Sequence, residues 1–308
     1  MEKTLLEKKY GLHIVNIKRL REGVDNNVYL IETDAYQQYV LRESKRTSLL
    51  QHNDDLLFET TAISFLHSRG IPVASVIPTK DTSTFFKHDS TFYVLFEYKP
   101  GISPQCSKDF SSAVPEAACY LAQIHNLTPP PHLPKRSRTV FTELERVMAC
   151  KKTVEEKIEG GVGYVQEVEE VLNRATAYSN NTGFVHNDYR SGNILVNDGR
   201  VSAILDFDWI CIGPCAKDIG LAIVEWSFPD NKTVPDQSII KKFILHYNKN
   251  ARHPADKATL QFWVSFACLS ETATYLIDML ESSVYKKVQG SFMYQKYQYF
   301  NTHPELLL

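Results

Sequence analysis

Residues 184–208 read FVHNDYRSGNILVNDGRVSAILDFD and hold the densest group of polar side chains suited to chemistry in the chain. Asp188 follows His186 by two residues, and Asn193 comes five residues after Asp188. Asp206 ends the second of two apolar runs, which are separated by Asn-Asp-Gly at 197–199. Because Asn-Asp-Gly between apolar runs is a strong hairpin signal, we expect a hairpin that returns Asp206 to the loop holding Asp188.

This spacing suits phosphoryl transfer. That reaction needs a carboxylate to orient the attacking hydroxyl and oxygen ligands to hold Mg²⁺ against the phosphates. Asp188 fits the first task, while Asn193 and Asp206 offer the hard oxygen atoms that Mg²⁺ prefers. Arg190 is placed to neutralise charge on the moving phosphoryl group. Each residue alone is more often a solvated loop residue or a helix cap, but the four together at these positions favour catalysis.

Before this stretch, the first hundred residues are rich in predicted strands. Apolar and β-branched runs bounded by turn formers predict strands over 14–20, 27–33, 37–43, 71–77 and 91–98. Residues 54–69 begin with acidic residues, carry helical apolar spacing and stop at Gly70, which predicts one helix. We expect a twisted antiparallel sheet with this helix packed on it.

After Lys99-Pro100-Gly101 the pattern becomes mostly helical. Helices are predicted over 113–126, 141–150, 163–179 and 259–282, and the proline-rich residues 128–134 predict an exposed, stiff connector. The fold class is therefore α+β with two lobes, residues 1–98 and 99–308, joined by a hinge near 97–101. Ligands commonly bind where two such lobes meet.

Composition excludes several other classes of protein. The 308 residues carry a formal net charge of -2, which argues against a general nucleic-acid or membrane-surface binder. The amino terminus lacks a signal-peptide pattern, and no apolar run is long enough for a membrane span. The six cysteines are scattered, and Cys211 and Cys215 lack the partners of a zinc site, so we expect reduced thiols and a cytoplasmic location.

Several segments resemble the aminoglycoside phosphotransferase family, which includes choline, homoserine and fructosamine kinases and shares the protein-kinase-like fold. The family pattern H-G-D-x-x-x-x-N, I-D-x and D-[IL]-A is matched here by HNDYRSGN, ILDFDW and KDIGLA. The resemblance extends to EGVDNNVYLIE, FETTAISFLHSRGIPV, YVLFEYKPG and LAQIHNL, which cover the nucleotide-loop strands, small-lobe helix, hinge and a large-lobe helix.

This resemblance implies an ATP-dependent, Mg²⁺-requiring kinase for a small hydroxyl acceptor. It makes Asp188 the catalytic base and Asn193 and Asp206 the metal ligands. The roles that it implies elsewhere are phosphate binding by Arg42 paired with Glu59, adenine binding by the backbone near Glu97 and Tyr98, and support of the catalytic loop by Asp218.

The chain departs from related kinases in ways that bear on its substrate. Arg42 stands where lysine is usual, and the nucleotide loop has only Gly23. Asn187 and Asp208 differ from the protein-kinase signature, and no A-P-E follows, so a small-molecule acceptor is favoured over a protein. The alternatives are a catalytically weak or inactive nucleotide-binding protein and an atypical protein kinase.

The predicted helix 259–282 suggests what kind of acceptor would bind. It has few acids (Glu271, Asp278 and Glu281) beside much aliphatic and aromatic surface. An amino alcohol or amino acid alcohol therefore fits at least as well as an aminoglycoside, and the run EGVDNNVYLIET resembles homoserine-kinase-like members. The sequence leaves open the acceptor's identity, the choice between ATP and GTP, and the oligomeric state.

Overall fold

The structure, a computed structural model, describes residues 2–22, 26–44, 53–106, 110–228, 234–277 and 286–307. The chain forms two compact units. Unit 1 contains residues 1–101, 130–137 and 202–208, and unit 2 contains residues 102–129, 138–201 and 209–308. Unit 1 is thus assembled from three separate stretches of chain. The lobe boundary at residue 98 remains a prediction.

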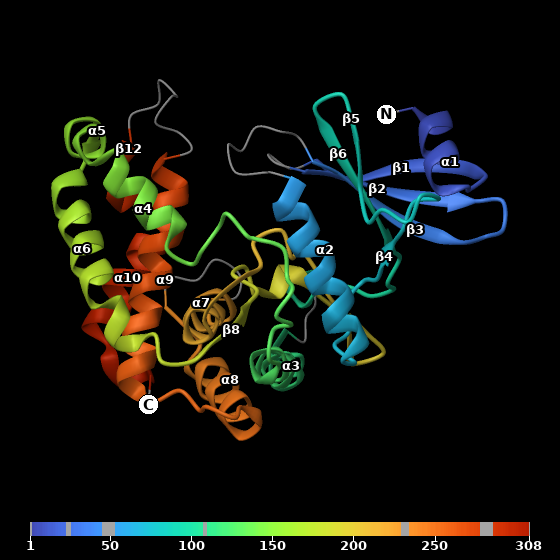
Figure 1. The fold of residues 1–308 in the computed structure, drawn as a ribbon. Helices are drawn as coiled ribbons and strands as arrows, with labels where there is room; N and C mark the ends of the chain where they lie inside the picture. The colour runs from blue at the N-terminus through green and yellow to red at the C-terminus, as the bar shows by residue number, and fades with distance from the viewer. Residues whose placement is uncertain are drawn as a thin grey trace. The chain divides into compact units, whose positions relative to one another are not determined.

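Unit 1 is built on an antiparallel sheet (Figure 1). Its strands run in the order β1 (Ile14–Glu22), β2 (Asn26–Thr33), β3 (Gln38–Ser44), β6 (Thr91–Glu97) and β4 (Val76–Ile77), and β5 (Phe86–His88) also pairs with β6. Side chains alternate between the two faces of a strand, so β6 buries Tyr93 and Leu95 in one apolar cluster and Phe92 and Val94 in another. Both faces of the sheet are therefore packed.

The two helices of unit 1 contribute to these different clusters. α2 (Asn53–Ser68) matches the predicted helix and places Leu56 against Phe92 and Val94. α1 (Lys3–Tyr10) was not predicted, because its short sequence is dominated by charge and buries little more than Leu6 and Tyr10. It ends at a left-handed glycine, Gly11.

One predicted strand of unit 1 is much shorter than expected. Of residues 71–77, only Val76–Ile77 joins the sheet as β4. Val73 instead makes an isolated bridge to Ile204, and the Ile204 N–H donates to the carbonyl of Pro72 at 2.7 Å. Proline lacks the N–H of a regular ladder, which explains why the apolar run did not become a longer strand.

Unit 2 is mainly helical (Figure 1). Its main helices are α3 (Val114–Asn126), α4 (Thr142–Ala149), α5 (Lys151–Lys157), α6 (Gly161–Arg174), α7 (Ala216–Trp226), α8 (Gln237–Asn250), α9 (Lys257–Ile277) and α10 (Phe292–Thr302). Short 3-10 turns include η3 (Ala175–Tyr178), η4 (Ser191–Asn193) and η7 (Pro304–Leu307). The predicted helices over 113–126, 141–150 and 163–179 are confirmed, the last ending as η3, whereas the part of 259–282 beyond Ile277 lies outside the described residues.

Helices α7 and α9 form the centre of unit 2. A Cβ atom on Gly220 of α7 would come within 2.4 Å of the Trp263 carbonyl oxygen of α9. Glycine is therefore required for the two backbones to approach so closely. Trp263 of α9 and Trp226 of α7 are both completely buried.

Two short strand pairs frame the chemically interesting loop. β8 (Thr182–Val185) pairs antiparallel with β11 (Cys211–Pro214), and β9 (Ile194–Asn197) pairs with β10 (Arg200–Ile204). The turn between β9 and β10 has positive φ at Asp198 and Gly199, as the Asn-Asp-Gly signal predicts. The predicted hairpin is confirmed, and the return of Asp206 to the loop that holds Asp188 stays a prediction.

Two further expectations from the sequence can be checked. Within the described residues, no helix is long and apolar enough to cross a membrane. Cys119, Cys150, Cys211, Cys215 and Cys268 are all free thiols. Burial raises the pKa of Cys215 to about 12, so that thiol stays protonated and packs as a small apolar group.

Candidate active site

The loop after β8 brings Asp188 and Asn193 into direct contact within unit 2. The Asn193 amide Nδ2 donates to Asp188 Oδ2 at 2.7 Å and to the Asp188 carbonyl oxygen at 3.0 Å. Asn193 is buried, and its Oδ1 accepts no hydrogen bond from the described residues. The pair therefore fixes one oxygen of the carboxylate and leaves an amide oxygen available to a ligand.

Arg190 approaches the other oxygen of the same carboxylate. Its Nε lies 3.2 Å from Asp188 Oδ1, and the two side chains are 40% and 20% exposed. An ion pair this accessible to water contributes little to stability. The contact can therefore be exchanged for a substrate group at small cost.

Asp218, in the first turn of α7, binds the backbone of this loop. Its carboxylate accepts hydrogen bonds from the backbone N–H groups of His186 and Asn187, the latter at 2.7 Å, and lies 3.3 Å from His125 Nε2. Burial alone would raise the pKa of Asp218, but the hydrogen bond with His125 and the neighbouring His125, His186 and Lys217 side chains hold it below its usual value. A buried, ionised aspartate thus ties two loop residues to the core of unit 2, which agrees with the supporting role predicted for it.

The loop carries backbone strain next to Asp188. Asn187 has φ of 67°, a left-handed conformation that costs most L-residues free energy but that asparagine tolerates better than most. Its carbonyl oxygen faces the buried Lys217 Nζ at 3.4 Å. Such conformations persist where surrounding contacts fix them, and they are frequent at functional sites.

In unit 1, the predicted pair of Arg42 and Glu59 is present and is bidentate. Arg42 on β3 donates from Nη1 and Nη2 to the two Glu59 carboxylate oxygens at 2.7 and 2.8 Å. Both side chains are almost fully buried, so Arg42 is not an exposed strand residue. Burial alone would lower the pKa of Arg42, but Glu59, with Asp208 and Asp206, raises it, so the guanidinium remains charged.

Arg42 also keeps donor capacity. Its Nε is buried and has no hydrogen-bond partner among the described residues. The guanidinium therefore has an N–H that an oxyanion such as a phosphate could accept. The phosphate-binding role of Arg42 stays a prediction.

Asp206 and Asp208 belong to the third stretch of unit 1. Asp206 has φ of 66°, again left-handed, and Phe207 after it is buried. Asp208 Oδ2 accepts from Asn26 Nδ2 at 3.1 Å, and Asn26 Oδ1 accepts from the Ser44 hydroxyl at 2.8 Å. The aspartate that replaces the protein-kinase glycine is thus used to bind the start of β2. The predicted nucleotide-loop glycine, Gly23, lies outside the described residues.

The predicted adenine site lies where β6 ends. The Glu97 N–H already donates to the Ser75 carbonyl at 2.8 Å, and the Glu97 carboxylate binds Lys99 at 2.9 Å. Tyr98 follows with 36% of its surface exposed. Any adenine contact at Glu97 must therefore use a group other than its N–H. The adenine-binding roles of both residues stay predictions.

The predicted site residues thus fall into two groups. Unit 2 brings together Asp188, Arg190 and Asn193, while in unit 1 Arg42 lies against Glu59 and in the field of Asp206. Among the described residues, no three His, Cys, Asp or Glu side chains form a metal cluster. Mg²⁺ in phosphoryl-transfer sites is held by one or two protein oxygens plus phosphates and water, so Asn193 Oδ1 and the Asp206 carboxylate are donors of the right chemistry.

Sequence reasoning missed the residues that hold the loop from behind. His125 on α3 contacts Asp218 through Nε2, and its Nδ1 lies 2.8 Å from the Tyr247 hydroxyl on α8. Both are buried. A single histidine or tyrosine on an apolar helix face is ordinarily a core residue, so only the contact with Asp218 identifies this chain of polar groups.

Glu271 on α9 is a further ionisable residue of unit 2. Removal from water raises the pKa of its carboxyl, Lys217 and Arg190 oppose that rise, and Glu225 and Glu143 add to it. Within the described residues Glu271 makes no hydrogen bond or ion pair. No Lys, Arg or His nitrogen of the described residues lies within 4 Å of its carboxylate.

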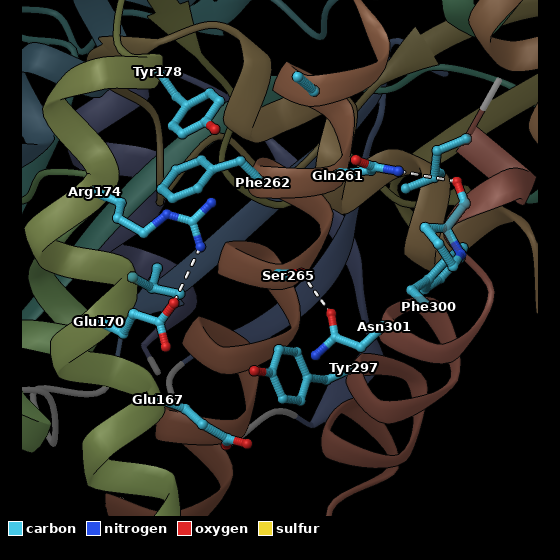
Figure 2. Close-up of a pocket in the computed structure, with 14 residues that line it drawn as sticks. Glu167, Glu170, Arg174, Tyr178, Gln261, Phe262, Ser265, Tyr297, Phe300 and Asn301 are labelled. Atoms are coloured by element: carbon cyan, nitrogen blue, oxygen red, sulfur yellow. Dashed lines mark hydrogen bonds and ion pairs between the residues drawn. The ribbon is translucent and has the colours of Figure 1, made fainter.

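A cavity of about 320 Å³ lies elsewhere in unit 2, and it contains none of the predicted site residues (Figure 2). Its walls come from α6, η3, α9, α10 and η7. Figure 2 shows Arg174 reaching from α6 toward Phe262 beside its partner Glu170, and Ser265 bonded to Asn301. Its polar groups largely bind one another, which distinguishes this cavity from the loop that bears Asp188.

Known proteins similar to this chain identify its family. The profile of the "Phosphotransferase enzyme family" matches residues 16–243. A homoserine kinase from Caulobacter vibrioides is 25% identical over 215 residues, covering 68% of this chain and 65% of that relative, so the chain spans less than two thirds of it. A homoserine kinase from Neisseria meningitidis is 24% identical over 271 residues, covering 82% of each.

Solved structures of low identity share the fold. A microcompartment-associated aminopropanol kinase has a TM-score of 0.72 at 17% identity, covering 98% of this chain and 97% of that one. A spectinomycin phosphotransferase, solved with ADP and spectinomycin, has a TM-score of 0.67 at 15% identity, covering 99% and 95%. A choline kinase from Streptococcus pneumoniae has a TM-score of 0.67 at 14% identity, covering 98% and 97%. The predicted protein-kinase-like α+β fold is confirmed.

Proposed function

Because this chain belongs to the phosphotransferase enzyme family, we propose that it transfers the γ-phosphoryl group of ATP, bound with Mg²⁺, to a hydroxyl group of a small molecule. The observation that supports this most directly is the Asp188–Asn193 contact on a loop tied down by Asp218. Phosphoryl transfer depends on positioning and charge rather than on covalent chemistry, and this loop offers a positioned carboxylate.

Asp188 is the proposed base. Asn193 holds its Oδ2, which leaves Oδ1 to accept the hydrogen bond of the acceptor hydroxyl in exchange for Arg190. As the hydroxyl oxygen bonds to the γ-phosphorus, its proton passes to Asp188 and the bond to the β–γ bridging oxygen breaks, releasing ADP. Arg190, displaced from Oδ1, would then be free to stabilise charge on the transferring phosphoryl group.

Asn193 and Asp206 are the proposed metal ligands. Asn193 Oδ1 accepts no hydrogen bond from the described residues, and Asp206 supplies a carboxylate. When bound, Mg²⁺ neutralises charge that develops on the β- and γ-phosphate oxygens. Arg42, kept charged by Glu59, is proposed to bind the phosphates, with Glu97 and Tyr98 near adenine. Arginine can donate to two phosphate oxygens at once, so it can serve where lysine is usual.

The proposed acceptor is a small amino alcohol or amino acid alcohol. Glu271 supports this choice, because a carboxylate with a raised pKa and no close cation gains when an ammonium group binds beside it. The relatives named homoserine kinase and the neighbour named aminopropanol kinase support the same class. Homoserine and aminopropanol are therefore the first acceptors to test, followed by choline and aminoglycosides.

The test is ADP release by purified protein with Mg·ATP across a panel of these acceptors. We expect turnover with at least one amine-bearing alcohol and loss of that turnover in Asp188→Asn, with nucleotide binding retained. Binding of Mg·ATP without turnover of any acceptor would favour a nucleotide-binding protein that lacks activity. Phosphorylation of added proteins in preference to the panel would favour an atypical protein kinase.

A further inference from the structure

The proline-rich segment that leads from α3 to α4 carries a polar contact that the proposed mechanism does not use. Its residues 130–137 belong to unit 1, although their neighbours on both sides belong to unit 2. We propose that Arg136 in this segment is a positioning residue: it couples α2, and so the Arg42–Glu59 pair, to the segment that carries Asp206. This inference rests on the proposed function, because it assigns Arg136 to the handling of Mg·ATP.

Arg136 spans two backbone carbonyl groups of unit 1. Its Nη1 donates to the Asp55 carbonyl oxygen at 2.7 Å, and its Nη2 donates to the Asp208 carbonyl oxygen. The side chain is 6% exposed, and its guanidinium lies 5.7 Å from the centre of the Phe58 ring on α2. Burying a charged side chain is costly unless its donors are satisfied, so the two carbonyl contacts are held firmly.

The segment also binds the first turn of α2 through the next residue. The Ser137 N–H donates to Asp55 Oδ1 at 2.8 Å, and the Ser137 hydroxyl donates to Asp55 Oδ2 at 2.6 Å. Glu59 stands four residues after Asp55, one turn further along the same helix. A shift of the first turn of α2 would therefore move Glu59 and, through the bidentate pair, Arg42.

The other end of the coupling is the Asp206 segment. Asp208 is fixed through its carbonyl by Arg136 and through its carboxylate by Asn26. Two residues earlier, Asp206 is left-handed, a conformation that costs a non-glycine residue free energy and lasts only where the surroundings impose it. Arg136 is one of the contacts that impose it.

Arginine is the side chain that this arrangement requires. Its planar fork presents two N–H donors to two different carbonyl groups, whereas a lysine ammonium is a compact point charge on a single flexible stem. Arg136→Lys therefore keeps the charge and loses the bridge. Arg138, two residues later, provides a matched control, because it is also buried but belongs to unit 2, where it lies over the Trp209 ring at 4.1 Å.

The experiment compares Arg136→Lys, Ser137→Ala and the control Arg138→Lys in steady-state assays with the acceptor that the wild type prefers. We expect Arg136→Lys to raise the KM for ATP and the Mg²⁺ concentration at half-maximal rate by about tenfold, since one charge-assisted hydrogen bond is lost. The KM for the acceptor should not change. Ser137→Ala should raise the KM for ATP and the Mg²⁺ requirement by a smaller factor. Arg138→Lys should change neither.

Two outcomes would overturn the role of Arg136. One is a rise in the KM for the acceptor as large as the rise in the KM for ATP in Arg136→Lys. The other is the same KM for ATP and the same Mg²⁺ requirement in Arg136→Lys and Arg138→Lys. If Arg136→Lys fails to fold, Ser137→Ala still decides, since it removes one of the two hydrogen bonds to the Asp55 carboxylate and leaves Arg136 in place. No change in either ATP parameter for that variant would then reject the coupling.

A second readout separates this inference from the proposed function. Binding of Mg²⁺ with a non-hydrolysable ATP analogue, measured by calorimetry, requires no acceptor and no turnover. We expect Arg136→Lys to weaken that binding about tenfold and to speed amide hydrogen exchange in the first turn of α2. If no acceptor is phosphorylated but binding responds in this way, the proposed function fails and the coupling stands. Wild-type binding and exchange in Arg136→Lys would reject the coupling, whatever the wild-type activity.

Discussion

Among the predicted site residues, each unit holds one arginine–carboxylate pair, and the two pairs differ in almost every physical respect. Arg42–Glu59 in unit 1 is bidentate, with both side chains nearly excluded from water. Arg190–Asp188 in unit 2 joins Nε to Oδ1 at 3.2 Å, with both side chains partly exposed. A buried pair resists separation because each charge alone would be costly, whereas an exposed pair separates easily.

This difference indicates different tasks for two pairs of the same kind, an arginine with a carboxylate. Arg42 is fixed in position before any ligand binds, as suits a group that holds phosphates in a constant place. Asp188 has one oxygen fixed by Asn193 and one oxygen in an exchangeable pair, as suits a group that must accept a substrate proton. The predictions below test this contrast.

The largest effect is expected from Asp188→Asn. The amide keeps the shape but cannot accept the hydroxyl proton, so kcat should fall by about 10²–10⁴-fold. The affinity for Mg·ATP should stay near the wild-type value. Steady-state rates and calorimetric nucleotide binding measure the two quantities, and a variant with wild-type turnover would reject Asp188 as the base.

Breaking the buried pair should mainly affect stability. Glu59→Ala leaves Arg42 charged and buried without its bidentate partner, so the free energy of unfolding should fall by about 3–5 kcal/mol. Replacing both residues, as Arg42→Met with Glu59→Leu, should recover much of that loss while binding of ATP stays impaired. Urea unfolding of the two variants tests this, and equal destabilisation of both would show that the cost is not one of unpaired charge.

Asp218→Asn should remove a pH-dependent part of the stability. The pKa of Asp218 is lowered in the folded state, so its contribution is complete above the unfolded value near 3.9 and is lost as pH falls through the folded value. The variant should therefore melt below the wild type at pH 7, and the gap should narrow below about pH 4. Melting temperatures from pH 7 to pH 3 provide the measurement, and a gap that stays constant with pH would contradict it.

Arg190→Gln should separate activity from stability. An exposed pair contributes at most about 1 kcal/mol, so unfolding should change little. The rate should still fall, by about tenfold, if Arg190 stabilises charge on the transferring group. Parallel measurements of kcat and of thermal unfolding decide this, and an unchanged kcat would return Arg190 to the ordinary surface residues.

Glu271→Gln should give the smallest effect and the opposite sign to Asp218→Asn. The pKa of Glu271 is raised in the folded state. The wild type therefore loses stability as the pH rises from the pKa of an unfolded glutamate through the pKa of Glu271 in the folded protein. The variant should therefore melt about 2 °C above the wild type at pH 8 and equal it near pH 4. Its KM for an amine-bearing acceptor should rise, and a lower melting temperature at pH 8 would contradict the assignment.

Much of this architecture could be read from the sequence. The Asn-Asp-Gly turn predicted the β9–β10 hairpin because few residue pairs adopt its backbone angles. The pairing of Arg42 with Glu59 followed from family resemblance, and their burial could not be seen, since a period-two pattern does not reveal that both faces of a sheet are covered. Residues 71–77 were overestimated as a strand because the apolar run outweighed Pro72.

Polar contacts between residues far apart in the sequence could not be predicted. The partners of His125 are Asp218 and Tyr247, which lie 93 and 122 positions away. Arg136 binds a backbone carbonyl, that of Asp208. No local spacing encodes such contacts. Residues 128–134 were read as a stiff connector, which the composition supports, yet the composition gave no sign that the residues just after it bind α2. Asp208 stands where the protein-kinase signature has glycine, and only its hydrogen bond from Asn26 shows what this aspartate does.

The assembly of unit 1 from three stretches has a consequence for biosynthesis and engineering. A chain released after residue 101 would lack the Ile204 N–H that binds Pro72, and it would lack Arg136 and Ser137 for the start of α2. During translation, the sheet can therefore complete its contacts only after residue 208 has left the ribosome. Transplanting the first hundred residues as a cassette would leave those positions unfilled, whereas circular permutation would preserve every one of them.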